Sequence, residues 1–338
     1  MKVKRQYAAI DIAKYVSALL VVCIHVFPFY ELNPTFNTFW MQTVCRIAVP
    51  FFFTVSGFFF FRKIEEGNAE NMEHLKKFVW RILKIYFVWT LIYLPYTIYD
   101  HYKAGFSILL FLSYIRDFFM AGSYYHLWFL PALAVGTCIV YTLYKKKGLI
   151  FTLKSCLILY VVGYLINIYA PIWESIPGIN FLYAFFEKIF VTARNGIFFG
   201  PMFISLGLLL SKTKRLPKKV SALGFAGSFL CVVLEVSIYY FLGILQDLSC
   251  MFVTLIPTVY FLVNWLLAIR LPYKPIYRSM REDSLIIYTS HILFAKIFLN
   301  ILPEAHLVAY FLTIACAQGL ASLIDYYRKK FPVLEKVF

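Results

Sequence analysis

The chain has 338 residues, of which 62% are hydrophobic, 20% aromatic and only 15% charged. This composition excludes an ordinary soluble domain, because a core of this size cannot hide so much apolar surface, and it indicates an integral membrane protein. The net charge of +16 lies in short clusters between apolar windows, so we expect it to orient the chain in a lipid bilayer, and we expect no nucleic-acid partner.

Ten apolar windows follow one another along the chain, each close to the ~20 residues that a helix needs to cross the hydrocarbon layer. They fall near residues 8–30, 40–61, 79–99, 125–144, 149–170, 195–211, 221–242, 249–269, 284–302 and 307–327. Clusters of lysine and arginine mark alternate connections, which places both termini in the cytoplasm. We therefore expect an all-α integral membrane protein, a bundle of about ten transmembrane helices. Residues 1–338 form a single polytopic domain in this interpretation, with no fused soluble domain.

The polar residues of the first window share one helix face. Asp11 and Lys14 are one turn apart, and the steps from Lys14 to His25 return the helix to nearly the same face, roughly 16 Å further along its axis. A polar stripe of this kind costs free energy in lipid. We therefore expect all three side chains to face protein, water or a ligand.

The second window carries one cation, Arg46, within its apolar run. Arg46 lies about 9 Å below Trp40 on a helical rise, near the depth expected for His25. It either snorkels toward the membrane surface or faces the polar residues of the first helix. Ser56 and Gly57 follow, and small residues there kink a helix or let another backbone approach closely.

Four cations near the cytoplasmic side have two interpretations. Arg81 and Lys84 lie one turn apart at the start of the third window, where long cationic side chains often snorkel. Together with Lys14 and Arg62 they alternatively form a cytoplasmic socket for phosphate groups.

The later windows carry further polar residues. His126 and Trp128 open the fourth window, and an aromatic belt explains Trp128 alone. Arg194 and Asn195 lie at the outer mouth of the sixth window. His291 lies about halfway through the ninth, where a histidine more often bonds two helices together than catalyses a reaction.

Four other features complete the sequence-based expectations. Glu235 lies in the middle of the seventh window, where we expect a protonated or hydrogen-bonded carboxyl group. The outward loop 100–125 is amphipathic, which predicts a helix at the membrane interface. The outward segment 171–193 is a candidate lid or acceptor-facing loop. The seven cysteines have no metal-ligand spacing, so we expect no metal.

Several of these segments together resemble the membrane acyltransferase 3 superfamily. The resemblance rests on Ala9-Ile10-Asp11-Ile12-Ala13-Lys14 with its spacing to His25, on 46–57 (RIAVPFFFTVSG), on 126–130 (HLWFL), on 194–196 (RNG) and on 284–291 (SLIIYTSH). It covers nearly the whole chain. The pattern looks closest to the Gram-positive branch that includes the membrane portion of vancomycin-resistance serine racemases.

The resemblance implies transfer of an acyl group, usually acetyl, from cytoplasmic acyl-CoA to a hydroxyl of a cell-envelope glycan or a lipid-linked acceptor. It also implies a multi-pass protein of the bacterial plasma membrane, and it leaves room for a separate extracellular or membrane partner. By similarity, His25 aligns with the family's essential histidine. Lys14 falls where the family usually has arginine, and Leu133 replaces a glutamate that some members carry.

A thioester donor requires a base for the acceptor hydroxyl, positioned charge for the oxyanion and exclusion of water. We expect His25 to be the base, or alternatively a transient acyl carrier, with Asp11 and Lys14 organising the cytoplasmic half of the stripe. The candidates for binding the acceptor or the oxyanion are Arg46, Ser56, His126, Trp128, Arg194, Asn195 and His291. The candidates for binding the coenzyme A phosphates are Lys14, Arg62, Arg81 and Lys84.

A transporter remains the main alternative. A polar stripe with ionisable residues on several helices also describes a secondary transporter of a small amino acid such as serine, or an exporter of an envelope glycan. Against transport, the sequence shows no inverted repeat and no matched pair of Gly/Pro-broken helices.

Overall fold

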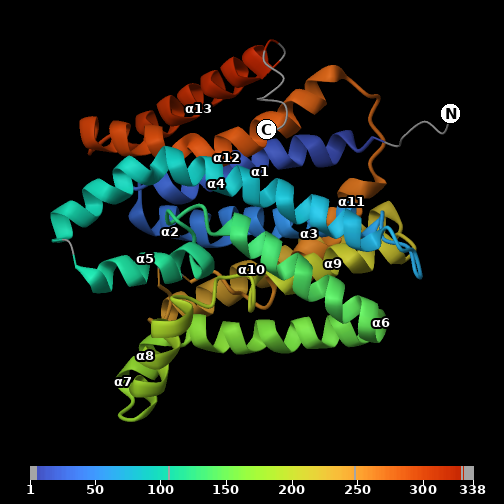
Figure 1. Ribbon diagram of the computed structural model, residues 1–338, viewed down its shortest axis with the longest axis horizontal. Helices are drawn as coiled ribbons and strands as arrows, with labels where there is room; N and C mark the ends of the chain where they lie inside the picture. Colours follow the sequence, from blue (N-terminus) through green and yellow to red (C-terminus); the bar gives the residue numbers. More distant parts are fainter. Residues whose placement is uncertain (1–5, 106, 247–248, 329, 331–338) are drawn as a thin grey trace.

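The computed structural model describes residues 6–105, 107–246, 249–328 and 330, and the regular structure of these residues is helical throughout. The helices are α1 (Ala8–Val26), α2 (Pro34–Thr43), α3 (Ala48–Phe61), α4 (Asn71–Ala104), α5 (Ile108–Met120), α6 (Phe129–Ile168), α7 (Ala170–Ser175), α8 (Ile179–Phe190), α9 (Gly200–Lys212), α10 (Lys218–Phe241), α11 (Leu255–Ala268), α12 (Pro275–Ile301) and α13 (His306–Arg328). A short 3-10 helix, Cys45–Ile47, joins α2 to α3. Figure 1 shows most of the long helices running along the long axis of the molecule.

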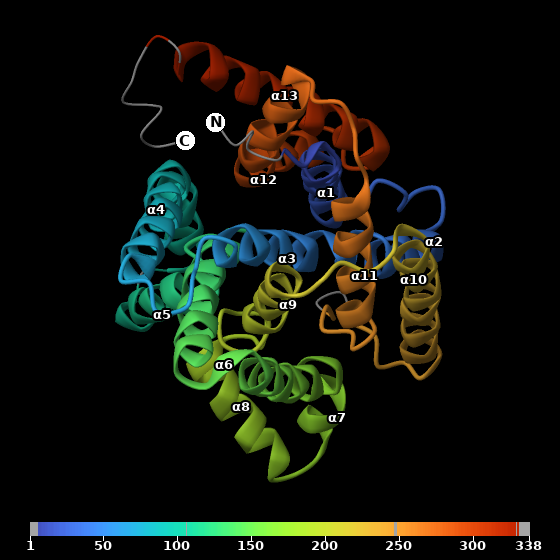
Figure 2. The same ribbon diagram turned by 90° about the vertical axis from the view of Figure 1, so that its right-hand side faces the viewer.

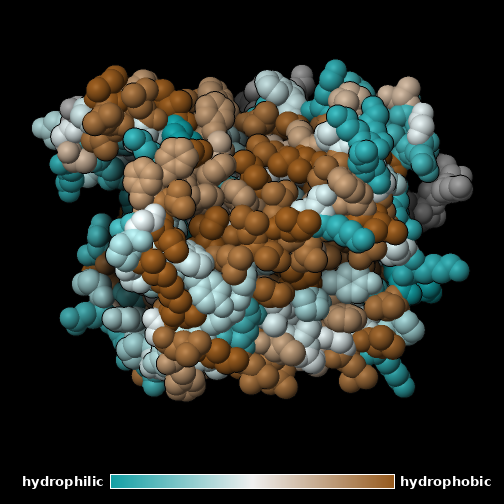
Figure 3. All heavy atoms as spheres, turned by 90° about the horizontal axis from the view of Figure 1, so that it is seen from below, coloured by the Kyte–Doolittle hydropathy of each residue, from teal (hydrophilic) through white to brown (hydrophobic). Residues whose placement is uncertain are grey.

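Seven helical segments of the described chain are long and apolar enough to cross a membrane, which confirms the multi-pass interpretation. They are α1, the segment Pro34–Phe61, α4, α6, α10, α12 and α13. The face drawn in Figure 3 is hydrophobic over its middle and hydrophilic mainly toward its edges, as expected for a surface that contacts lipid.

The ten expected windows all coincide with helices, but three of them do not give a separate long span. Two windows fall in α6, where Gly148 has a non-helical backbone with φ of 76° and kinks the helix between them. The sixth and eighth windows coincide with helices that are too short to cross the hydrocarbon layer alone. These are α9, with 13 residues, and α11, with 14 residues, and each is only about 20 Å long. The count of ten spans and the cytoplasmic termini therefore stay predictions.

Polar side chains explain why α11 begins late. The Glu235 carboxylate accepts hydrogen bonds from the backbone N–H of Val253 at 3.0 Å and of Thr254 at 2.9 Å, directly before the first turn of α11. The Asn167 amide oxygen accepts another from Cys250 N at 3.0 Å. Irregular backbone at membrane depth requires such partners. Of the two states expected for the Glu235 carboxyl group, protonated or hydrogen-bonded, the structure confirms that the group is hydrogen-bonded.

Helix α3 lies at the centre of the bundle, with α1, α4, α6, α9 and α11 around it (Figure 2). A Cβ atom on Gly207 would lie 2.2 Å from the Thr54 carbonyl oxygen, and one on Gly57 would lie 2.5 Å from that of Ile204. Helices α3 and α9 therefore pack backbone against backbone. The close approach predicted at Gly57 is confirmed.

Two amphipathic helices lie at one end of the molecule, toward the left of Figure 1. Neither α5 nor α8 buries a residue, and the Arg116 guanidinium joins them by donating to the Lys188 carbonyl at 3.0 Å. Helix α5 lies within the segment 100–125, for which the sequence predicts an interfacial helix. Its exposed apolar side chains fit that prediction.

Candidate active site

Three histidines from distant parts of the chain meet inside the bundle. His25 comes from α1, His126 from the turn before α6, and His291 from α12. The His25 ring centroid lies 5.2 Å from that of His291 and 6.5 Å from that of His126, and the latter two are 5.2 Å apart. The three rings form a cluster, which we call the histidine cluster. Within the described chain, no group of three or more histidine, cysteine, aspartate or glutamate side chains is arranged to hold a metal ion.

Two rings of the histidine cluster have fixed tautomers. His126 Nε2 lies 3.1 Å from the Thr289 carbonyl oxygen, and His291 Nδ1 lies 3.1 Å from that of Ile287. Because a carbonyl only accepts, the ring proton of each neutral imidazole sits on that nitrogen. The other two nitrogens, His126 Nδ1 and His291 Nε2, are buried without a hydrogen-bond partner. Each therefore presents a free lone pair. If His291 were purely structural, we would expect it to form a hydrogen bond to another helix. Its hydrogen bond is instead to the Ile287 carbonyl of its own helix.

His25 is the accessible member of the histidine cluster. It is half-buried, whereas His126 and His291 are buried. Its ring contacts the exposed ring of Tyr125 at 5.4 Å, and within the described chain the imidazole makes no hydrogen bond. It is therefore free to receive a proton from a ligand that approaches past Tyr125.

Two arginines lie around the histidine cluster. Arg46 is buried, and its Nε–H donates to the Gln42 amide oxygen at 2.7 Å. Arg46 therefore faces protein and does not snorkel. The Arg194 guanidinium lies 5.0 Å above the Trp128 ring. Both guanidinium charges are close enough to act electrostatically on His25.

Asn195 shapes the backbone near this cluster. Its amide oxygen accepts from the N–H groups of Ile197 at 2.8 Å and Phe198 at 3.1 Å, and its amide nitrogen donates to the Thr192 carbonyl. These bonds hold the turn that leads into α9 and places Arg194. The amide thus has local partners, and acceptor binding by Asn195 stays a prediction.

A large cavity opens at the opposite end of the bundle from α5 and α8. Its volume is about 1110 Å³, slightly above the ~300–1,000 Å³ typical of small-molecule sites. One stripe of α3 lines it with Phe52, Ser56 and Phe59, and α1 contributes Asp11 and Lys14. Ser56 therefore faces the cavity and not the histidine cluster.

The mouth of the cavity is basic. Eight lysine and arginine residues line it against four carboxylates, so it attracts anions. The cations are Lys14, Arg62, Lys63, Lys77, Arg81, Arg278, Arg281 and Arg328, and we call them the basic rim. Three of the four expected phosphate-binding residues belong to it, whereas Lys84 is not among the described lining residues.

The polar stripe of α1 is divided between the two sites. Asp11 is buried beside Arg281, whose Nη1 lies 3.9 Å from its Oδ2, and Lys14 Nζ lies 5.2 Å from the Phe59 ring centroid. Ala18 and Val21 are buried between these residues and His25. Asp11 and Lys14 therefore belong to the cavity, and His25 belongs to the histidine cluster.

Sequence reasoning missed the tyrosines that support the cluster. The Tyr288 hydroxyl donates to the His126 carbonyl at 2.6 Å, and the Tyr93 hydroxyl donates to the Thr289 carbonyl at 2.9 Å. Tyr288 precedes His291 by three residues, so their common face was a usable signal. The arginines of α12 in the basic rim were interpreted only as orientation charges.

Comparison with known proteins gives one family. Residues 7–324 match the acyltransferase domain of the acyltransferase 3 family. An amino-acid racemase of Enterococcus faecalis is 31% identical over 285 residues, covering 84% of this chain and 39% of that protein. A serine/alanine racemase of Enterococcus gallinarum is 31% identical over 233 residues, covering 67% of this chain and 32% of that protein. The chain thus spans less than half the length of these relatives. No solved structure is significantly similar.

Proposed function

The chain belongs to the acyltransferase 3 family, and we propose that it is a membrane O-acyltransferase. It takes an acyl group, most simply acetyl, from cytoplasmic acyl-CoA and transfers it to a hydroxyl of a cell-envelope glycan or a lipid-linked acceptor. One observation carries the proposal: a cavity of about 1110 Å³ leads from the basic rim to Tyr288 and Phe129, next to the histidine cluster.

The basic rim fits the donor. Coenzyme A carries several phosphate charges at one end and its thioester at the other, so a charged mouth with an apolar inner end matches both parts. Cations from three elements meet at this mouth. They are Arg62, directly after α3, Arg81 on α4 and Arg281 on α12. The thioester then lies toward the histidine cluster.

The histidine cluster fits the acceptor. His25 takes the proton of the acceptor hydroxyl, the oxygen attacks the thioester carbonyl, and the coenzyme A thiolate leaves as the C–S bond breaks. Arg46 and Arg194 stabilise the oxyanion that forms between these events. His126 and His291 accept hydrogen bonds through their free nitrogens, which suits them to hold the hydroxyl groups of the acceptor.

The test is acyl transfer by the purified full chain in liposomes. Radiolabelled acetyl-CoA and an envelope fraction should give label in the acceptor fraction and free coenzyme A. A His25→Ala protein that elutes as a folded species should lose nearly all of this transfer. Full transfer by His25→Ala would show that His25 is not the base.

A second candidate follows from the relatives. The Enterococcus gallinarum relative acts on serine and alanine by its name, so the chain alternatively carries such an amino acid across the membrane. The same liposomes are therefore tested for uptake of labelled serine without acyl-CoA. Uptake without transfer selects the transporter, and transfer without uptake selects the enzyme.

A further inference from the structure

The inner end of the cavity is closed by aromatic rings. The lining residues furthest from the basic rim are Phe52 on α3, Phe129 at the start of α6 and Tyr288 on α12. The Phe129 ring centroid lies 6.0 Å from that of Phe52 and 5.6 Å from that of Tyr288. The three rings therefore form a continuous layer, which we call the aromatic layer.

The aromatic layer lies directly between the cavity and the histidine cluster. Tyr288 lies three residues before His291 on α12, about 4.5 Å along the helix axis, and its ring centroid is 6.1 Å from that of His126. Phe129 follows His126 by three residues on the other side. Only one ring thickness therefore separates the cavity from His126 and His291 of the histidine cluster.

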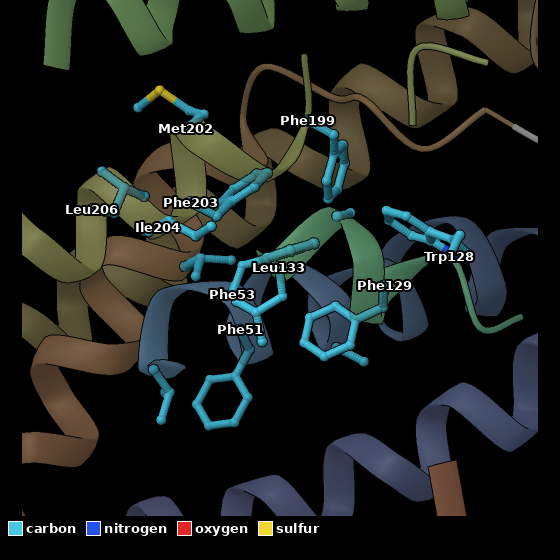
Figure 4. Packing of buried hydrophobic residues seen from close by; sticks show 14 of the residues in the cluster. Phe51, Phe53, Trp128, Phe129, Leu133, Phe199, Met202, Phe203, Ile204 and Leu206 are labelled. Atoms are coloured by element: carbon cyan, nitrogen blue, oxygen red, sulfur yellow. The ribbon is translucent and has the colours of Figure 1, made fainter. Parts of the chain in front are cut away.

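A second layer of rings holds Phe129 in place. Its ring centroid is 4.6 Å from that of Phe53, which in turn lies 5.9 Å from Phe199. Figure 4 shows these side chains packed together with Trp128. Phe129 and Phe53 are buried. Packed rings at native density cannot shift to make room for added methylene groups without loss of contacts.

Phe52 differs from the other members of the layer. It is only half-buried, and it lies on the cavity stripe of α3 one turn beyond Ser56. Its ring is therefore the part of the layer with space to move on the cavity side.

We propose that the aromatic layer limits the length of the acyl group on the donor, with Phe52 and Phe129 as the specificity-determining residues. This inference rests on the proposed function. With the phosphates on the basic rim and the thioester at the inner end of the cavity, the acyl carbons point into the aromatic layer. An acetyl group fits into the inner end of the cavity against this layer, whereas each further methylene meets a packed ring.

The expected selectivity follows from the fit of single methylene groups. One excess methylene in a fitted apolar pocket changes specificity by about tenfold or more. The wild-type chain should therefore use acetyl-CoA in preference to butyryl-CoA, and it should use hexanoyl-CoA hardly at all.

The test measures release of free coenzyme A by the full chain in liposomes with an envelope fraction. The donors are acetyl-, butyryl- and hexanoyl-CoA. Phe52→Ala opens the cavity side of the layer and should raise the butyryl-to-acetyl ratio of kcat/KM by about tenfold. Phe129→Leu is a second, smaller opening with less effect on packing. Phe52→Trp should act in the opposite direction.

Phe59→Ala is the matched control. Phe59 is also half-buried and lies on the same cavity stripe of α3, but about 10 Å nearer to the basic rim. It should change KM for all donors alike and leave the ratio unchanged. An unchanged ratio in both Phe52→Ala and Phe129→Leu overturns the inference, as does an equal change in Phe59→Ala. If the wild-type chain releases coenzyme A from none of the donors, the proposed function itself is wrong.

Discussion

The Tyr288 hydroxyl donates a hydrogen bond of 2.6 Å to the backbone carbonyl of His126, and so ties α12 to the turn that carries a histidine of the cluster. The same helix places His291 one turn further on. The Tyr288 side chain thus forms part of the aromatic layer at the inner end of the cavity and also fixes the position of His126.

Removing this hydroxyl should weaken both roles. Tyr288→Phe keeps the ring but leaves the buried carbonyl without this donor, which costs about 1–3 kcal/mol of unfolding free energy. Because the His126 turn loosens, kcat should fall more than KM rises. Thermal unfolding and steady-state acyl transfer measure the two effects. A Tyr288→Phe chain with wild-type kcat would show that the bond does not position His126.

The basic rim offers a paired test on one helix. Arg81 lines the cavity, whereas Lys84, one turn further along α4, is not among its described lining residues. Arg81→Gln should raise KM for acetyl-CoA several-fold, and the increase should shrink at high salt, because charge attraction to phosphate is screened. Lys84→Gln is the control and should leave KM nearly unchanged. Equal effects of the two substitutions would place the phosphates elsewhere.

Glu235 should matter for stability and not for chemistry. Its carboxylate accepts hydrogen bonds from the backbone N–H groups of Val253 and Thr254 before α11. Glu235→Ala therefore leaves two backbone donors without this partner and should cost about 1–3 kcal/mol per lost bond at most. Glu235→Gln keeps one acceptor oxygen and should lose less. Thermal unfolding in detergent tests this order, and activity per folded molecule should be unchanged in Glu235→Gln.

The loop between α1 and α2 contains a pH-sensitive contact with His306. Burial alone raises the pKa of the Glu31 carboxyl group, but the hydrogen bond from the His306 backbone N–H and the nearby His306 ring outweigh it and lower the pKa below the ordinary 4.5. The stabilisation is therefore fully present above about pH 4.5. This stabilisation is lost as the pH falls through the lower pKa that Glu31 has in the folded chain.

Unfolding measurements between about pH 3 and 6 should show this loss in the wild-type chain. Glu31→Gln cannot titrate, and its stability should depend less on pH across the same range. An identical pH dependence of the two proteins would mean that the contact contributes nothing.

Much of the arrangement could be predicted from local patterns in the sequence. The helical class, the positions of all the apolar windows, the placing of His25 on the inner face of α1 and the close approach at Gly57 follow from periodicity and residue size. Three of the four residues of the predicted phosphate socket, Lys14, Arg62 and Arg81, line the cavity as members of the basic rim.

The remaining features depend on tertiary contacts that no local pattern contains. The late start of α11 is set by Glu235, which lies on another helix. The division of the α1 stripe depends on Phe52 and Tyr288 from two further helices, which line the inner end of the cavity. The fixed tautomers of His126 and His291 depend on carbonyl groups whose positions only the folded chain provides.

The central claim is that a donor in the cavity passes its acyl group to an acceptor at His25. The most direct measurement is transfer of radiolabel from acetyl-CoA to an envelope fraction by the full chain in liposomes, with wild-type and folded His25→Ala chains side by side. The account predicts transfer by the wild-type chain and almost none by His25→Ala. Equal transfer by both chains, or serine uptake with no transfer by either, would contradict it.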